Sequence, residues 1–126
     1  MTIDEFYNQV GQRLGTSDRQ EIESATRSVL AAVADRINRP EAQDLASQLP
    51  KELADLVKGR GGPVQKMDAE TFMARIQSDL DLQTPEQAER VSRSVLSVLK
   101  EAVSQGEWED VMSQLPRDLQ VMFAMA

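Results

Sequence analysis

The chain has 126 residues, contains neither cysteine nor histidine, and carries a formal net charge of −7. This composition excludes disulfides, thiol or imidazole catalysis and thiolate metal sites, and the negative charge disfavours nucleic acid and anionic membranes as partners. The N-terminus lacks the pattern of a signal peptide, and no apolar run approaches the roughly 18 residues of a membrane helix, so we expect a cytoplasmic location.

The N-terminal segment is predicted to begin with two helices. Thr2 and Glu5 have the spacing of a capping box, and apolar residues follow them at helical intervals, so the first helix should begin at Thr2. Gly15 and Ser17 then predict a turn and a new N-cap. A long helix with one apolar stripe is expected from about residue 18 to 37.

Two short helices should follow, separated by a proline. Pro40 is placed where the first turn of a helix tolerates proline, whereas Pro50 interrupts the helix that Pro40 begins. The next helix should end near Gly59. Residues 58–66 contain three glycines, one proline and three basic groups, which predicts a solvated linker.

The remaining segment shows the same order of signals. Asp68 should cap a helix, and Thr84 with Pro85 should begin a second long helix that ends at Gly106. Pro116 then divides a final pair of short helices. Alternating β-branched runs and Asn-Gly turns are absent from the sequence, so the predicted fold class is all-α.

The chain also matches itself when residues 1–57 are laid over residues 67–123, an offset of 66. Fifteen of the 57 aligned positions are identical, and Arg-Ser-Val-Leu and Ser-Gln-Leu-Pro runs recur in both copies. Such regularity predicts tandem duplicated helical units of three to four helices each, packed as one pseudo-twofold bundle. The expected organisation is a first unit over 1–57, a linker over 58–66 and a second unit over 67–126, forming one compact domain.

The paired Ser-Val-Leu and Gln-Leu-Pro motifs resemble a bacterial family known as domain of unknown function twenty-two sixty-seven. The resemblance rests on Phe6 and Phe72 in the opening helices, on the long helices around Leu30 and Leu96, and on the two Gln-Leu-Pro runs. It covers nearly the whole chain and implies an all-helical fold. It implies no established activity and no catalytic residues.

Three carboxylates recur at aligned positions, and they are the candidates for polar roles. The pairs are Glu23 with Glu89, Glu41 with Glu107, and Asp44 with Asp110. Glu23 lies four residues before Arg27, and Glu89 four before Arg93, which predicts two ion pairs on helix surfaces rather than catalytic groups.

Asp44 with Gln48, and Asp110 with Gln114, lie one helical turn apart ahead of a proline. Each pair could bind backbone groups of a partner or brace the turn at the proline. We expect bracing, because proline leaves a carbonyl one turn earlier without its usual donor and a glutamine amide can supply one.

No metal site is predicted. Asp79 and Asp81 have the spacing of the first two ligands of an EF-hand loop, but Thr84 and Arg90 stand where that loop needs glycine and glutamate. We also expect no cofactor.

The second half carries larger apolar groups than the first, and these are the predicted partner-binding residues. They are Trp108, Met112, Met122 and Met125. Methionine and tryptophan suit adaptable contact surfaces, although the same residues could fill an asymmetric core.

The function expected from these features is that of an acidic protein-interaction or adaptor module that is not an enzyme. Its partner would be another protein or a second copy of the chain. The alternative is an enzyme based on carboxylates, or a helical bundle that binds a small ligand, because two carboxylates can serve as an acid and a base when burial raises one pKa.

Overall fold

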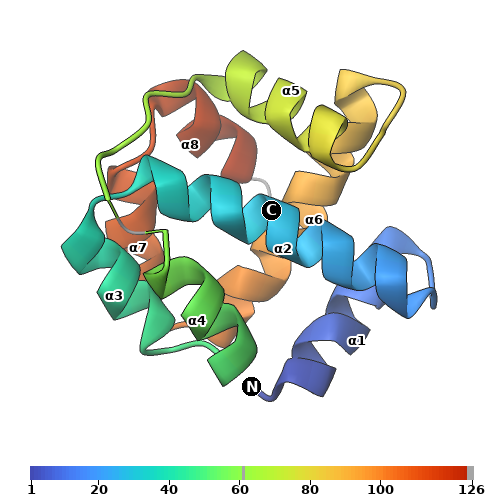
Figure 1. The fold of residues 1–126 in the computed structure, drawn as a ribbon, viewed down its shortest axis with the longest axis horizontal. Helices are drawn as coiled ribbons and strands as arrows, with labels where there is room; N and C mark the ends of the chain where they lie inside the picture. Colours follow the sequence, from blue (N-terminus) through green and yellow to red (C-terminus); the bar gives the residue numbers. More distant parts are fainter. Residues whose placement is uncertain (61, 125–126) are drawn as a thin grey trace.

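The computed structural model describes residues 1–60 and 62–124, and these residues form eight α-helices (Figure 1). In chain order the helices are α1 (Ile3–Leu14), α2 (Arg19–Arg36), α3 (Arg39–Ala46), α4 (Lys51–Lys58), α5 (Ala69–Asp79), α6 (Pro85–Ala102), α7 (Gln105–Ser113) and α8 (Arg117–Phe123). No strand occurs in the described parts of the chain. The all-α prediction is confirmed.

The helices of the two halves begin at positions that the alignment of the sequence with itself pairs. Each of α1 to α4 begins 66 residues before its counterpart among α5 to α8. The long helices α2 and α6 also have the same length, 18 residues. The local signals that start a helix therefore act at equivalent positions in the two halves.

Side-chain caps account for these starts. The Thr2 hydroxyl accepts a hydrogen bond from the Glu5 backbone N–H (3.1 Å), as the capping-box spacing predicts. The N-cap of α2 is Asp18 and not Ser17, because the Asp18 carboxylate accepts from the Gln20 N–H (3.0 Å).

Two glycines differ in their roles. Gly15 ends α1 with a φ of 75°, a left-handed conformation that glycine adopts without strain. Gly106 was expected to end the second long helix, but α6 ends at Ala102 and Gly106 lies in the first turn of α7. The Ser104 hydroxyl, which accepts from the Glu107 N–H at 3.2 Å, starts α7 ahead of the glycine.

The two halves share one core. Helix α1 packs against α6, α2 packs against both α5 and α6, and α3 packs against α7. In Figure 1, α2 runs across the centre of the molecule with α6 behind it. The three phenylalanines are fully buried, and the rings of Phe72 and Phe123 meet edge to face with centroids 5.5 Å apart. Much of the apolar surface of each half is thus covered by the other.

The segment that joins the halves is held against α2. The buried carboxylate of Asp35 pairs with Arg60 at 3.0 Å and with Arg75 of α5 at 2.8 Å, and the Asp35 carbonyl accepts from the Gln65 N–H at 2.9 Å. Pro63 and Val64 are exposed, as expected of a linker. The linker is nevertheless attached to its own first half at Arg60 and at Gln65, on both sides of Gly61 and Gly62 in the sequence.

None of the helices in the described residues is long and apolar enough to cross a lipid bilayer.

Candidate functional site

The contact between α3 and α7 places two glutamates face to face. Glu41 is the third residue of α3 and Glu107 is the third residue of α7. At this position a glutamate usually completes a capping box by accepting from the backbone N–H of the N-cap residue. Helix α6 contains such a box, between Thr84 and Gln87.

In α3 and α7 a glutamine from the opposite half takes over that role. The N–H of Asn38, the N-cap of α3, donates to Gln114 Oε1 at 2.8 Å. The N–H of Ser104, the N-cap of α7, donates to Gln48 Oε1 at 2.7 Å. Because the N-cap N–H groups donate to these glutamines, the carboxylates of Glu41 and Glu107 are not used for capping.

The two glutamates lie in the interior. Glu41 is 9% exposed and Glu107 is 7% exposed, and the Oε2 atom of each is buried without a hydrogen-bond partner. Burial, a hydrogen bond to Glu41, and the negative charges of Glu41, Asp44 and Asp110 raise the pKa of Glu107 to about 8. At neutral pH the pair therefore holds a proton.

Asp110 extends this arrangement to the surface. One carboxylate oxygen from each of Glu41, Glu107 and Asp110 lies within 4.8 Å of the others, and Asp110 is exposed. We call these three residues the acidic cluster. From the sequence we predicted no metal site, because no continuous ligand motif contains these three residues. The recurrence of the carboxylates in both halves was the signal that could have found the cluster.

The glutamines lie across the interface between the halves. We expected Gln48 and Gln114 to brace the prolines that follow them, but each side chain instead reaches the N-cap of the other half. Gln48 also donates from Nε2 to the Ser104 hydroxyl at 3.4 Å. The side chain that serves a carbonyl ahead of a proline is Gln120, which donates to the Leu115 carbonyl at 2.8 Å.

Replacing these glutamines tests the crossed caps. Gln48→Ala and Gln114→Ala should each lower the free energy of unfolding by about 1 kcal/mol, the usual net contribution of one such hydrogen bond. Urea denaturation measures the change. Gln43→Ala, on the exposed face of α3, is the matched control and should change stability by less than about 0.5 kcal/mol. Equal effects of all three variants would contradict a capping role.

A second feature is a groove of about 420 Å³ where α1, α2 and the turn between α5 and α6 meet. We call it the junction groove. Its apolar lining includes the partly exposed Leu14, Leu80, Leu82 and Val91, and its polar lining includes the exposed Asp18 and Glu21. Both halves contribute to it, and the Arg90 guanidinium fixes them together by donating to the Leu14 carbonyl at 3.0 Å.

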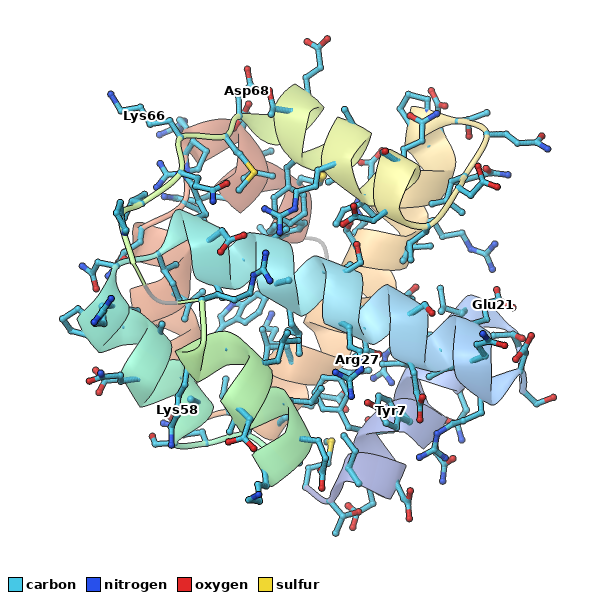
Figure 2. The ribbon with its side chains drawn as sticks, in the orientation of Figure 1. Tyr7, Glu21, Arg27, Lys58, Lys66 and Asp68 are labelled. Atoms are coloured by element: carbon cyan, nitrogen blue, oxygen red, sulfur yellow. The ribbon has the colours of Figure 1, made fainter. Side chains whose placement is uncertain are left out.

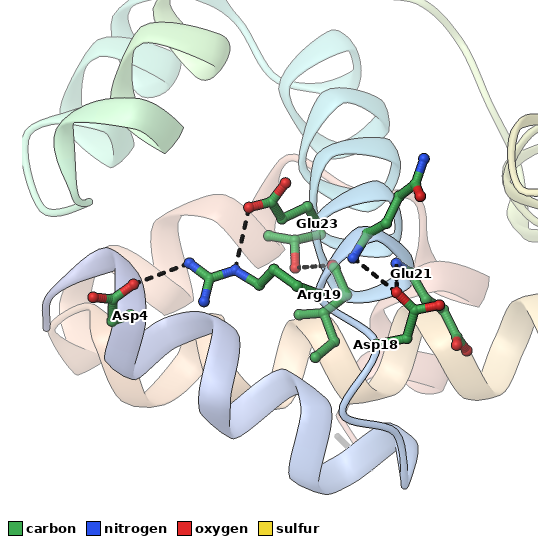
Figure 3. A network of polar contacts seen from close by, with 8 residues as sticks. Asp4, Asp18, Arg19, Glu21 and Glu23 are labelled. Atoms are coloured by element: carbon green, nitrogen blue, oxygen red, sulfur yellow. Dashed lines mark hydrogen bonds and ion pairs between the residues drawn. The ribbon is translucent and has the colours of Figure 1, made fainter.

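The polar edge of this groove is shown in Figure 3. The Asp18 carboxylate is held by the N–H groups at the start of α2, including that of Glu21 at 3.5 Å. Arg19 points the other way, pairing with Asp4 of α1 at 3.0 Å and with Glu23 at 3.2 Å. The positive charge nearest to Asp18 in the chain is thereby directed away from the groove.

One of the two predicted ion pairs is present. Glu89 and Arg93 form the expected pair at 2.8 Å, but Glu23 contacts Arg19. Arg27 instead lies beside Tyr7 of α1, where its positive charge acts on the Tyr7 hydroxyl, and Figure 2 shows these two side chains next to each other. The two arginines differ because of a tertiary contact. Tyr7 occurs in the first half only, and Met73 occupies the aligned position in the second.

The predicted partner-binding residues do not form one exposed surface. Trp108 is buried in the core cluster at 7% exposure, with the Lys100 ammonium 5.8 Å from its ring centre. Met112 and Met122 are partly buried against the same core, and Met125 lies outside the described residues. The indole fills space that is occupied by Ala42 in the first half, so the core is asymmetric at this point. Whether the methionines contact a partner stays a prediction.

Comparison with known proteins gave a family but no described activity. No curated protein matches the chain. Residues 3–122 match the model of a family described as "Uncharacterized conserved protein (DUF2267)". This match spans nearly the whole chain, as the resemblance of the Gln-Leu-Pro motifs implied. The chain belongs to the DUF2267 family.

Proposed function

We propose that the protein is a helical interaction module that acts without catalysis and binds another protein through the junction groove. The observation that carries the proposal is the lining of that groove, in which partly exposed leucine and valine side chains lie beside exposed carboxylates. Apolar side chains left accessible at a junction of helices are a common basis for recognising a partner helix.

The chemistry of the groove indicates the chemistry of the partner. Leu80, Leu82 and Val91 would receive the apolar face of an amphipathic helix, while Asp18 and Glu21 would attract lysine or arginine at its edge. Figure 2 shows Glu21 at the outer end of α2, turned toward solvent. The net charge of −7 would also speed the encounter with a basic partner.

Affinity capture from the cell of origin tests the proposal. The tagged chain should enrich one protein that carries a basic amphipathic helix, and Leu82→Glu or Val91→Glu should abolish the enrichment by placing a charge on the groove lining. Val121→Glu is the matched control, because Val121 is 59% exposed and lies on α8, which does not line the groove.

Two outcomes would count against this function. A partner retained by both groove variants would show that the groove is not the binding surface. Repeated recovery of this chain alone would replace the adaptor function with self-association, the other partner that the composition allows.

The acidic cluster supports the alternative function, a carboxylate-based enzyme or a binder of a small ligand. A pair of glutamates with one raised pKa has the properties of an acid and a base. However, Glu41 and Glu107 are both more than nine-tenths buried, so a substrate would have little access to the two carboxyl groups. This burial favours a proton or a single ion over a substrate, and we retain the non-enzymatic function.

We also infer that the two halves are copies of one unit and are related by a pseudo-twofold axis at the contact of α3 and α7. The crossed caps support this inference, because shifting each donor and each acceptor by 66 residues converts one hydrogen bond into the other. Glu41 and Glu107 are likewise equivalent positions that meet at this contact. The axis would thus pass through the acidic cluster.

A further inference from the structure

We propose that Glu41, Glu107 and Asp110 form a binding site for a hard divalent cation, of the class of Mg²⁺, Mn²⁺ or Ca²⁺, between α3 and α7. The site goes beyond the proposed interaction function and does not depend on it. It rests on the geometry of the acidic cluster and on two buried carboxylate oxygens without partners.

The separations within the cluster fit a single ion. One oxygen from each carboxylate lies within 4.8 Å of the other two. Oxygen ligands bind Ca²⁺ at about 2.3–2.6 Å and Mg²⁺ at about 2.0–2.1 Å, so two oxygens on opposite sides of one ion are roughly 4–5 Å apart. All three carboxylates can therefore reach the same ion with small side-chain adjustments.

The unpartnered oxygens are the second observation. Glu41 Oε2 and Glu107 Oε2 are buried and make no hydrogen bond. Both glutamates are more than nine-tenths buried, so solvent cannot supply the missing partners. A proton shared between the glutamates joins one oxygen of each and leaves others unsatisfied, which is costly in the interior. An ion at the centre of the cluster would satisfy both oxygens.

The charges around the cluster favour a cation. Glu41 and Glu107 lie in the first turns of α3 and α7, and each helix N-terminus contributes about half a positive charge. Against these stand four carboxyl groups, since Asp44 also acts on Glu107 through its charge. The negative charge of the carboxylates exceeds the two partial positive charges even when one carboxylate holds a proton.

The site is open to solvent, and its ligands determine which ions it suits. Asp110 is exposed, so an ion can enter from solvent and keep water molecules as its remaining ligands. All three ligands are carboxylates, and the chain has no cysteine or histidine, so the site suits ions that prefer oxygen over softer metals.

Terbium luminescence can detect occupancy directly. Trp108 is the only tryptophan and follows Glu107 in the chain, so excitation of the indole should sensitise the emission of a Tb³⁺ ion bound in the cluster. The full chain, freed of metal by chelation, would be titrated with Tb³⁺ at pH 7.5. The expected result is saturation at one ion per chain and loss of emission when Ca²⁺ or Mn²⁺ is added.

Substitutions then assign the ligands. Glu41→Gln and Glu107→Gln should each weaken Mn²⁺ binding, measured by isothermal titration calorimetry, at least tenfold. Asp110→Asn should weaken it several-fold and, as a change at an exposed residue, should leave the fold intact. Glu70→Gln removes one charge from the exposed surface of α5 and is the matched control, with unchanged affinity expected.

Three results would overturn the site. These are the absence of saturable Mn²⁺ and Tb³⁺ binding up to millimolar concentrations, an undiminished affinity in the Glu41→Gln/Glu107→Gln double variant, and an equal loss in Glu70→Gln. The last would indicate general attraction of cations to an acidic surface. Circular dichroism of each variant tests whether it is folded. If a glutamate variant is unfolded, the Mn²⁺ affinity of Asp110→Asn decides whether the cluster binds the ion.

Discussion

Residues 1–60 expressed alone are expected to show no cooperative thermal unfolding transition. Helix α1 packs on α6, and α2 packs on α5 and α6, so separation of the halves exposes apolar side chains that are fully buried in the chain, such as Phe6 and Leu30. A fragment of about 60 residues with an uncovered face cannot compensate for the conformational entropy of folding. Circular dichroism against temperature provides the measurement.

Adding the missing half is the control for this experiment. A mixture of fragments 1–60 and 64–126 should regain helical signal and a cooperative transition, because each fragment supplies the surface that the other needs. A cooperative transition from monomeric 1–60 by itself would show that one half is an independent folding unit. The shared core described above would then be unnecessary for folding.

The stability of the whole protein should fall as the pH rises from 5.5 to 8.5. The pKa of Glu107 is about 8 in the folded protein, above its ordinary value, because of burial and the charges of Glu41 and Asp44 on α3 and of Asp110 on α7. A group whose pKa is raised by folding stabilises the fold fully below its unfolded pKa, and this contribution is lost as the pH passes through the folded pKa. The slope cannot exceed about 1.4 kcal/mol per pH unit for one group, and we expect a loss of roughly 2–4 kcal/mol over this range.

Urea denaturation at four pH values in the presence of a chelator measures this loss. Glu107→Gln should flatten the pH dependence, since a neutral amide needs no proton to be buried, and it should be more stable than the wild-type chain at pH 8.5. Glu70→Gln keeps the acidic cluster and should retain the wild-type slope. Parallel pH profiles for the wild-type chain and Glu107→Gln would show that the glutamate pair does not control stability.

Local signals in the sequence predicted the helices well. Caps such as Thr2 and Asp68 and the Thr84-Pro85 start act within one turn of the chain, and the structure places helices where they indicate. The error in the end of α6 also has a local cause, because two nearby residues compete to set the helix boundary. Gly106 has the conformational freedom of a helix end, but Ser104 is the stronger N-cap and shifts the boundary.

The acidic cluster could not be predicted in the same way. From the sequence, Glu41 stands three residues after Asn38, which favours a contact within its own helix. Its observed surroundings depend on the packing of α3 against α7 and on Gln114 arriving from the other half. The junction groove depends in the same way on the meeting of segments from both halves, which helical periodicity does not specify.

The attachment of the linker to α2 has a consequence for how two copies of the chain can assemble. Proteins whose halves cover each other through a loose connector can exchange those halves between two molecules. Here Asp35 holds Arg60 and Gln65, which flank Gly61 and Gly62 in the sequence, and it also holds Arg75 of α5. An exchanged dimer would have to release this connector first, and the anchoring keeps the effective concentration of the chain's own second half high. The buried aspartate thereby favours closure within one molecule over domain swapping.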